Sequence, residues 1–322
     1  MNRRHFVTHT SAAAALAFIF RNSLFAQPTP PTPGPLPAPL PRPAQEVKTE
    51  FRPLRRDVGI FSGRGGTIGW LSSAAALAVV DTQFPETAKV CLDGLPNRGV
   101  RQIDVVINTH HHGDHTGGNA VFRPVAKSLV AHENVPGLQR AVAARANPPG
   151  ADPVVAENVF GESWRQNLGD EVVSARYFGP AHTKGDIVVM FEKANVVHLG
   201  DLMFNRRYPV IDRLGGASIE NWIRVLEKVA KDYPADAIYI FGHGKDSFGV
   251  TGKREDLLVF RDYLVELLTH TRKEISAGKS KAEIATLENL PGFPDFHEPR
   301  PNRLSSNLGT AFDELTKAEI KG

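Results

Sequence analysis

The stretch THHHGDHTGG, residues 109–118, places four histidines and one aspartate within six residues. It follows an apolar run, Ile103 to Ile107, that is typical of a buried β-strand. Neutral imidazole and carboxylate groups are the ligands that suit zinc and similar divalent ions. The frame H-x-H-x-D-H selects four candidate ligands, which are His110, His112, Asp114 and His115. The stretch therefore predicts a metal site in a loop at the end of a strand.

Three later segments each present one further candidate ligand beside a predicted strand. The segment GPAHTKGD, residues 179–186, contains His182 and lies between two predicted strands. Gly200-Asp201 follows a predicted hairpin, and His243, flanked by two glycines, follows the last predicted strand. A polar surface loop or a tag-like tract would have no need of these companions. We therefore expect all four segments to meet at one metal site.

Taken together, these motifs resemble the signature of the metallo-β-lactamase superfamily over roughly residues 50–250. The resemblance implies an α/β (α+β) fold, a four-layer αββα sandwich with metal at one edge of two packed sheets. It also implies two metal ions bridged by Asp201, with Asp114 orienting the nucleophile and passing on a proton as the catalytic residue. The implied ligands are His110, His112 and His182 for the first ion, and Asp114, His115 and His243 for the second.

The charge balance gives no support for a nucleic-acid partner. The chain has 322 residues, a formal net charge of +3, and three arginines but no acid in residues 1–26. Without those three, the 38 basic residues become 35, which equals the 35 acidic residues. A nucleic-acid-binding domain normally carries a basic stripe. The single cysteine, Cys91, excludes an intramolecular disulfide.

The N-terminal residues have the pattern of an export signal. Asn2 to Val7 contains twin arginines followed by a hydrophobic residue, and Ser11 to Phe20 is apolar but short for a membrane span. We predict a twin-arginine signal at residues 1–26, a proline-rich linker at 27–46 and a single folded domain at 47–322. The protein is then periplasmic or secreted, and it meets a membrane only through the export machinery or an uncleaved signal.

Periodicity predicts the remaining elements. Two strands within Phe51–Ser73 are joined by a glycine-rich turn, and residues 61–70 form either a flap over the metals or an ordinary tight turn. Further strands are predicted at Ala75–Val80, Ile103–Asn108, Ser128–Ala131, Glu171–Phe178, Asp186–Glu192, Asn195–Leu199 and Ala237–Phe241. Helices are predicted at Thr87–Leu95, Val135–Arg145, Ile219–Lys231, Arg254–Ser276 and Thr310–Ile320.

The resemblance implies an exported hydrolase whose metal-activated hydroxide cleaves a lactam, lactone, ester or thioester in a small molecule. Zinc is the expected metal, and iron or manganese remains open. A β-lactamase proper is an alternative, although the best-known broad-spectrum members carry a cysteine at the position of Asp201 and a lysine at that of Phe204. Two further alternatives are an iron-dependent persulfide dioxygenase-like oxidoreductase and a non-enzymatic metal-binding accessory protein.

Three cations near the ligand segments are candidates for binding an anionic part of the substrate. They are Arg206, Arg207 and Lys184. Solvated surface cations would give the same pattern, so this assignment rests on proximity in sequence alone.

Overall fold

The computed structural model describes residues 47–297 and 300–318. The predicted signal and linker, residues 1–46, lie outside the described residues, as do residues 298–299 and 319–322. In the part of the chain that is described, no helix is both long and apolar enough to cross a membrane.

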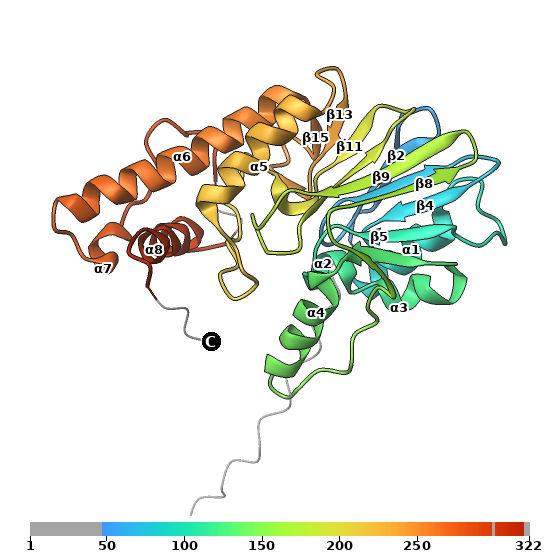
Figure 1. The fold of residues 1–322 in the computed structure, drawn as a ribbon, viewed down its shortest axis with the longest axis horizontal. Coiled ribbons are helices and arrows are strands. Elements are labelled where there is room, and N and C mark those ends of the chain that lie inside the picture. Colours follow the sequence, from blue (N-terminus) through green and yellow to red (C-terminus); the bar gives the residue numbers. More distant parts are fainter. Residues whose placement is uncertain (1–46, 298–299, 319–322) are drawn as a thin grey trace, which may run out of the picture. The chain divides into compact units, whose positions relative to one another are not determined.

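Two large sheets form the centre of the domain (Figure 1). The first sheet has seven strands in sequence order, antiparallel from β1 to β4 and parallel from β4 to β7. Its strands are β1 Glu50–Arg55, β2 Val58–Ser62, β3 Ile68–Ser72, β4 Leu77–Val80, β5 Val105–Asn108, β6 Leu129–His132 and β7 Asn158–Phe160.

The second sheet has the strand order β15-β13-β11-β10-β9-β8. These strands are β8 Ser163–Leu168, β9 Glu171–Tyr177, β10 Ile187–Phe191, β11 Val196–His198, β13 Ile238–Ile240 and β15 Thr251–Gly252. A short parallel pair stands apart from both sheets, formed by β12 Phe204–Asn205 and β14 His243–Gly244.

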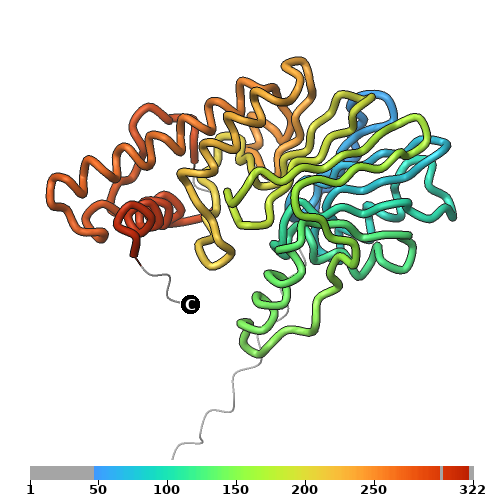
Figure 2. The backbone as a smooth tube through the Cα atoms, viewed as in Figure 1, coloured from blue at the N-terminus to red at the C-terminus, as the bar shows by residue number. Residues whose placement is uncertain are grey.

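Eight α-helices accompany the sheets in the described residues. They are α1 Pro85–Gly94, α2 Gly113–Thr116, α3 Asn119–Phe122, α4 Asn134–Arg145, α5 Ile219–Asp232, α6 Arg254–Ser276, α7 Lys281–Ile284 and α8 Arg303–Leu315. Helices α1 and α3 lie on one side of the strands and α5 and α6 on the other (Figure 1). The backbone trace shows α8 returning beside α6 (Figure 2).

The alternation of side chains along each strand explains why four layers form. In β5, Val105 and Ile107 point into the core between the two sheets, whereas Val106 points into the core beneath α1 and α3. In β10, Val189 faces the same central core, and Val188 faces the core beneath α5 and α6. The central strands of each sheet are therefore buried on both faces, which gives the order helix, sheet, sheet, helix. The predicted αββα sandwich is confirmed.

The direction of the strands brings chemically useful loops to one edge. Strands β4, β5 and β6 are parallel, and β9, β11 and β13 also share one direction, because β10 is antiparallel to both of its neighbours. The carboxyl ends of parallel strands meet at the same edge of a sheet, where open α/β sheets bind their ligands. At that edge the amide N–H of Ile187 donates to Thr109 O across the two sheets (3.0 Å).

The structure confirms most of the predicted elements and corrects three regions. The last helix, predicted at Thr310–Ile320, instead spans Arg303–Leu315. The long helix spans Arg254–Ser276 as predicted, and α5 ends one residue later than expected, at Asp232. The prediction of two strands in residues 51–73 is wrong, because a turn at Arg56, which has a positive φ of 53°, divides the first strand into β1 and β2. Strands β7 and β8 were not predicted, since most of their side chains are exposed or half-buried and give no apolar signal.

A stability prediction follows from the core beneath α5. Trp222 is fully buried, and its indole Nε1 donates to Leu202 O (3.0 Å) while the ring packs against Phe260. We expect Trp222→Ala to lower the free energy of unfolding by roughly 3–5 kcal/mol, because it removes a large ring and leaves a cavity. Denaturant unfolding followed by circular dichroism measures the loss. Arg224→Ala, at an exposed position of the same helix, is the matched control, and a loss of similar size in both variants would contradict this account.

Candidate metal centre

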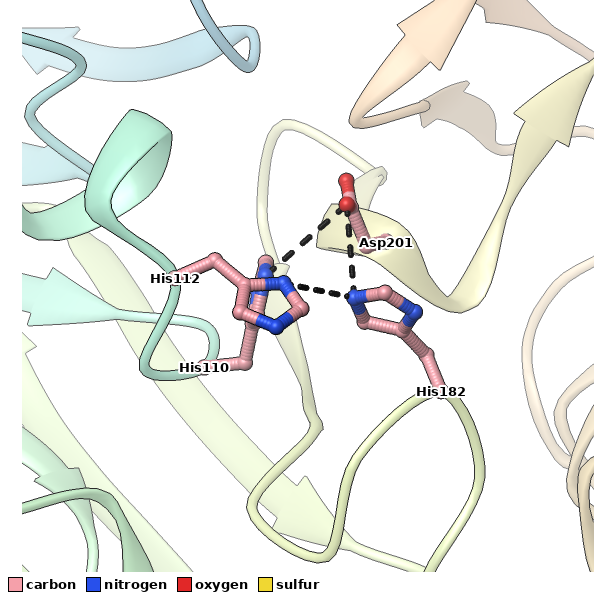
Figure 3. Close-up of side chains that lie close together, drawn as sticks. All are labelled: His110, His112, His182 and Asp201. Carbon is pink, nitrogen blue, oxygen red and sulfur yellow. Dashed lines mark hydrogen bonds and ion pairs between the residues drawn. The ribbon is translucent and has the colours of Figure 1, made fainter. Parts of the chain in front are cut away.

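Four of the predicted ligands converge at the shared edge of the two sheets (Figure 3). His110 and His112 follow β5, His182 lies in the loop between β9 and β10, and Asp201 lies in a single 3₁₀ turn after β11. The His182 Nε2 atom is 3.0 Å from His112 Nδ1 and 3.5 Å from Asp201 Oδ2. His110 Nε2 is 3.8 Å from the same oxygen. One ligand atom from each of the four residues lies within 4.8 Å of the others, which is close enough to hold one ion.

The other three predicted ligands form a second group beside the first. Asp114, His115 and His243 also bring their ligand atoms within 4.8 Å of one another. Asp201 Oδ1 is 3.0 Å from His115 Nε2 and 3.4 Å from His243 Nε2, so the two oxygens of this carboxylate face different groups. Asp114 Oδ2 lies 3.2 Å from His243 Nε2 and completes the second group. The structure thus brings all seven predicted ligands together.

Orphaned polar atoms at the centre indicate what these groups hold. His110 Nε2 is buried and has no hydrogen-bond partner among the described residues, and the buried atoms His115 Nε2 and Asp201 Oδ1 lie 3.0 Å apart without satisfying the geometry of a hydrogen bond. A buried polar atom without a partner is costly, and native structures usually satisfy it. A divalent cation would satisfy all three atoms at once, and histidine nitrogens with carboxylate oxygens are a suitable donor set. The residues present therefore fit a metal site.

The pKa values of the ligand histidines also indicate that the centre attracts positive charge. Burial lowers the pKa of His182 to about 3 and that of His110 well below its usual value, so both imidazoles are neutral at pH 7. In the second group burial also opposes the charged form, but the Asp201 carboxylate outweighs it. The pKa of His243 rises to about 9 and that of His115 rises well above its usual value. A metal cation would supply the charge that these protons provide.

The second nitrogen of four ligand imidazoles is held by a neighbouring group. His110 Nδ1 lies 3.1 Å from Thr109 Oγ1, and His182 Nδ1 lies 2.8 Å from the carbonyl oxygen of Val210. The remaining two partners are carboxylates. His115 Nδ1 lies 2.7 Å from Asp81 Oδ2, and His112 Nε2 lies 2.9 Å from Asp212 Oδ2. Such partners fix the orientation of a ligating imidazole and raise its basicity.

Asp81 and Asp212 each organise more than one group. Asp81 is fully buried and also accepts hydrogen bonds from the backbone N–H and the hydroxyl of Thr109. Asp212 lies 3.3 Å from His111 Nε2 and accepts a hydrogen bond from the N–H of Gly215. Asp81 directly follows β4. Asp212 is 100 residues from His112 and belongs to no motif, so the sequence does not indicate its role.

The glycine-rich loop lies directly on the ligands. Its Gly66 N–H donates to Asp114 O (2.9 Å), and the Thr67 N–H donates to Gly242 O (3.0 Å). A Cβ atom at Gly66 would lie only 2.1 Å from the His115 ring, so this close approach requires glycine. The loop is therefore hydrogen-bonded to both ligand segments and forms a fixed part of the rim.

A cleft of about 730 Å³ opens over the centre and contains His112, Asp114 and His243 in its wall. Of the predicted substrate-binding cations, only Arg207 lines it. Arg206 forms an ion pair with Asp256 (3.4 Å) and covers the ring of Phe248 instead. The prediction for Arg206 and Lys184 therefore finds no support in this cleft. Lys184 is exposed and lies against Gly216.

Three arginines that the sequence analysis did not single out also line this cleft. They are Arg64, Arg300 and Arg303. Arg64 comes from the glycine-rich loop, whereas Arg300 and Arg303 come from the C-terminal segment at the start of α8. No motif marks these residues, and only the fold of the C-terminal segment brings two of them to the metal centre.

Comparison with known proteins gives one family. The family model of the metallo-β-lactamase superfamily matches residues 63–243, which is more than half of the chain. A hydroxyacylglutathione hydrolase from Methylococcus capsulatus is 33% identical over 171 residues, covering 53% of this chain and 58% of that protein. A probable metallo-hydrolase from Methanocaldococcus jannaschii is 26% identical over 179 residues, covering 52% of this chain and 82% of that protein.

Solved structures show a similar fold at lower identity. A metallo-β-lactamase from Pontibacter korlensis superposes with a TM-score of 0.55 at 18% identity, covering 67% of this chain and 99% of that one. A double mutant of the sec-alkyl sulfatase PisA1 gives a TM-score of 0.64 at 16% identity, covering 84% of this chain and 51% of that one. At these identities the likeness concerns the fold alone.

Asp212 offers a test of how the centre is oriented. We expect Asp212→Ala to weaken zinc binding by roughly 10–100-fold, because it removes the partner that fixes the His112 ring. Competition with a chromophoric chelator measures the dissociation constant. Asp93→Ala, which removes an exposed carboxylate on α1, is the control. Equal zinc affinity in the wild type and Asp212→Ala would show that Asp212 does not orient the ligand.

The raised pKa of His243 predicts the pH dependence of metal binding. Because that pKa is about 9, the imidazole is protonated at pH 7 in the metal-free protein, and an incoming cation must displace the proton. The apparent affinity should rise with pH until about 9 and fall about tenfold per unit below it for each proton displaced. Calorimetric zinc titrations in two buffers of different ionisation enthalpy count the protons. Binding at pH 7 without proton release would contradict the assignment.

Proposed function

The chain belongs to the metallo-β-lactamase superfamily and is a metallohydrolase, and on this premise we propose that it is an exported enzyme with a dinuclear metal centre. The proposed reaction is hydrolysis of a carbonyl-type bond in a small molecule, with zinc as the metal. His110, His112 and His182 would hold one ion, Asp114, His115 and His243 the other, and Asp201 would bridge them.

The observation that carries this proposal is the arrangement around Asp201. Its carboxylate is 3% exposed, and each of its oxygens faces a different group of imidazole nitrogens. Several of those atoms are buried without partners. A structural ion would need only one such group and no cleft, since structural sites are closed. Two groups that share one carboxylate and open onto a cleft support a catalytic dinuclear site instead.

The chain's own residues position the reaction. Two divalent ions, when bound, would supply Lewis-acid polarisation and make water acidic enough to react at neutral pH. Asp114 lies at the cleft wall with its side chain 29% exposed, and the charges of His115 and His243 outweigh burial and hold its pKa well below the usual value. It is therefore ionised, and its carboxylate can orient a water molecule in the cleft and accept a proton from it.

The shape of the cleft favours a small substrate. A volume of about 730 Å³ is within the range of small-molecule pockets, which runs to roughly 1,000 Å³. Phe204 stacks on His243 with ring centroids 5.4 Å apart, so the wall beside the second group is apolar. The hydroxyacylglutathione hydrolases among the relatives make a thioester a substrate class to test first, with lactones and esters beside it.

Two alternatives differ in the chemistry that they require. A β-lactamase proper would have to bind its substrate with Phe204 at the position where the well-known enzymes carry a lysine. An iron-dependent persulfide dioxygenase would need one ion, whereas the chain supplies two groups of ligands. A non-enzymatic metal-binding protein would not need the cleft. The proposed hydrolase uses every one of these features.

Turnover by the zinc-loaded protein tests the proposal. The substrates are nitrocefin, a lactone, an aryl ester and a hydroxyacylglutathione thioester. We expect chelator-sensitive hydrolysis of at least one non-lactam substrate with kcat/KM above roughly 10⁴ M⁻¹s⁻¹, the lower end of ordinary enzymes. His112→Ala should be inactive, because it removes a ligand of the first group. His270→Ala changes a histidine of α6 outside the centre and should retain activity.

The outcomes separate the candidate functions. Rapid turnover of nitrocefin alone would make the protein a β-lactamase proper. Oxygen consumption with a persulfide by iron-loaded protein, without hydrolysis, would favour the oxidoreductase. Hydrolysis that survives both the chelator and His112→Ala would exclude the metal centre as its source.

A further inference from the structure

The cleft over the metal centre is lined by more positively charged than negatively charged side chains. Arg207 lines it, and so do Arg64, Arg300 and Arg303, whereas Asp114 is its only lining carboxylate among the described residues. An ion in the second group would occupy that carboxylate. The arginines would then face the cleft beside further positive charge, which favours the entry of an anion.

Two of the nearby arginines are already compensated. Arg64 pairs with Glu86 and lies over the ring of Phe84. Arg206, next to Arg207 in the chain, pairs with Asp256. The positive charge of each of these two side chains is thus balanced by a carboxylate of the protein. Neither charge needs a bound ligand to balance it.

Arg207 differs from both of them. Its Nε is buried and has no hydrogen-bond partner in the described structure, and its Nη1 makes one long hydrogen bond to Gly244 O (3.4 Å). Burial lowers the pKa of this guanidinium, the charges of Asp201 and Asp246 oppose that effect, and the charges of Arg300 and Arg303 add to it. An arginine nevertheless stays charged in proteins. Arg207 is thus a partly buried cation with unused donors, beside two more cations.

The C-terminal segment is fixed in place on both sides of these two residues. Before Arg300, Phe296 is buried and stacks on Tyr263 (4.8 Å between ring centroids), and His297 pairs with Arg207 in a β-bridge. After Arg303, the side chain of Leu304 is fully buried in the core beneath α6. The described residues on both sides of the pair are therefore held by packing contacts of the domain.

We propose that Arg207, together with Arg300 and Arg303, binds an oxyanion of the substrate, so that the enzyme acts on small acids. The anion is a carboxylate, sulfate or phosphate group, which planar guanidinium donors bind in a bidentate manner. It lies on the arginine side of the cleft, while the bond to be cleaved lies at the metal centre. The inference rests on the proposed function of the same cleft and names its substrate class.

The location of these arginines gives the inference a further consequence. Arg300 and Arg303 lie beyond residues 63–243, the part of the chain that matches the family model. The metal ligands all lie within that range. Arg207 lies within the range that supplies the catalytic centre, so a separate segment contributes only the Arg300 and Arg303 part of the anion site.

Isothermal titration calorimetry of the zinc-loaded full chain tests the anion site without turnover. The probes are acetate, sulfate and hydrogen phosphate, each titrated at constant ionic strength. We expect at least one to bind with a millimolar or lower Kd, and Arg207→Ala and Arg303→Ala each to weaken it by roughly tenfold or more. Arg206→Ala is the matched control, because it removes a neighbouring cation that faces Asp256, and should bind as the wild type does.

The variants distinguish the arginines from the metals as the source of binding. An anion that merely coordinates zinc would bind Arg207→Ala as tightly as the wild type, and that result would overturn the proposal, as would the absence of binding by all three probes. If Arg207→Ala does not fold, Arg207→Lys keeps the charge but not the planar fork and should still weaken binding. If the protein binds an anion through Arg207 but has no hydrolytic activity, the proposed function is contradicted and the proposed anion site is still supported.

Discussion

The structure depends on one buried carboxylate that has to be neutralised. Asp201 is almost completely inaccessible, and its two oxygens face two groups of imidazole nitrogens that come from loops of both sheets. An isolated buried charge is expensive unless it is paired or coordinates a metal. The positive charge is supplied by His115 and His243, because the Asp201 carboxylate raises the pKa of both imidazoles. The ligands, their outer partners and the loop above them are all arranged around this requirement.

The sandwich is the means by which such a centre is assembled. The central strands of each sheet are buried on both faces, so the only places where polar groups can gather along them are their ends. The first sheet supplies His110, His112, Asp114 and His115 through the loop after β5, and the second supplies His182, Asp201 and His243 from three further loops. Carboxylates such as Asp81 and Asp212 then hold the rings at fixed angles. The packing of hydrophobic strands thus determines where the chemistry can occur.

The sequence singled out the seven residues that meet at the centre because each belongs to a short local motif near the end of an apolar strand. It could not identify Asp212 or the arginines of the C-terminal segment, since their relation to the centre exists only after residues about 100 positions apart have packed together. Arg206 does not line the cleft, for a local reason. Its backbone adopts a left-handed conformation (φ 56°), and its side chain contacts Asp256, while that of Arg207 lines the cleft. The edge strand β8 was missed because its inward positions include the polar Gln166, which breaks the apolar alternation in the sequence.

The glycine at position 66 has an implication for how this enzyme can change. There is no room for even a methyl group between its backbone and the His115 ring, so the roof of the centre cannot be altered by substitution at that point. Mutations that broaden or shift the range of substrates must accumulate elsewhere along the rim. The start of α8 is open to such change, because Arg300 and Arg303 reach the cleft without holding the ligands. The fold thus separates a part that evolution must keep from a part that it is free to vary.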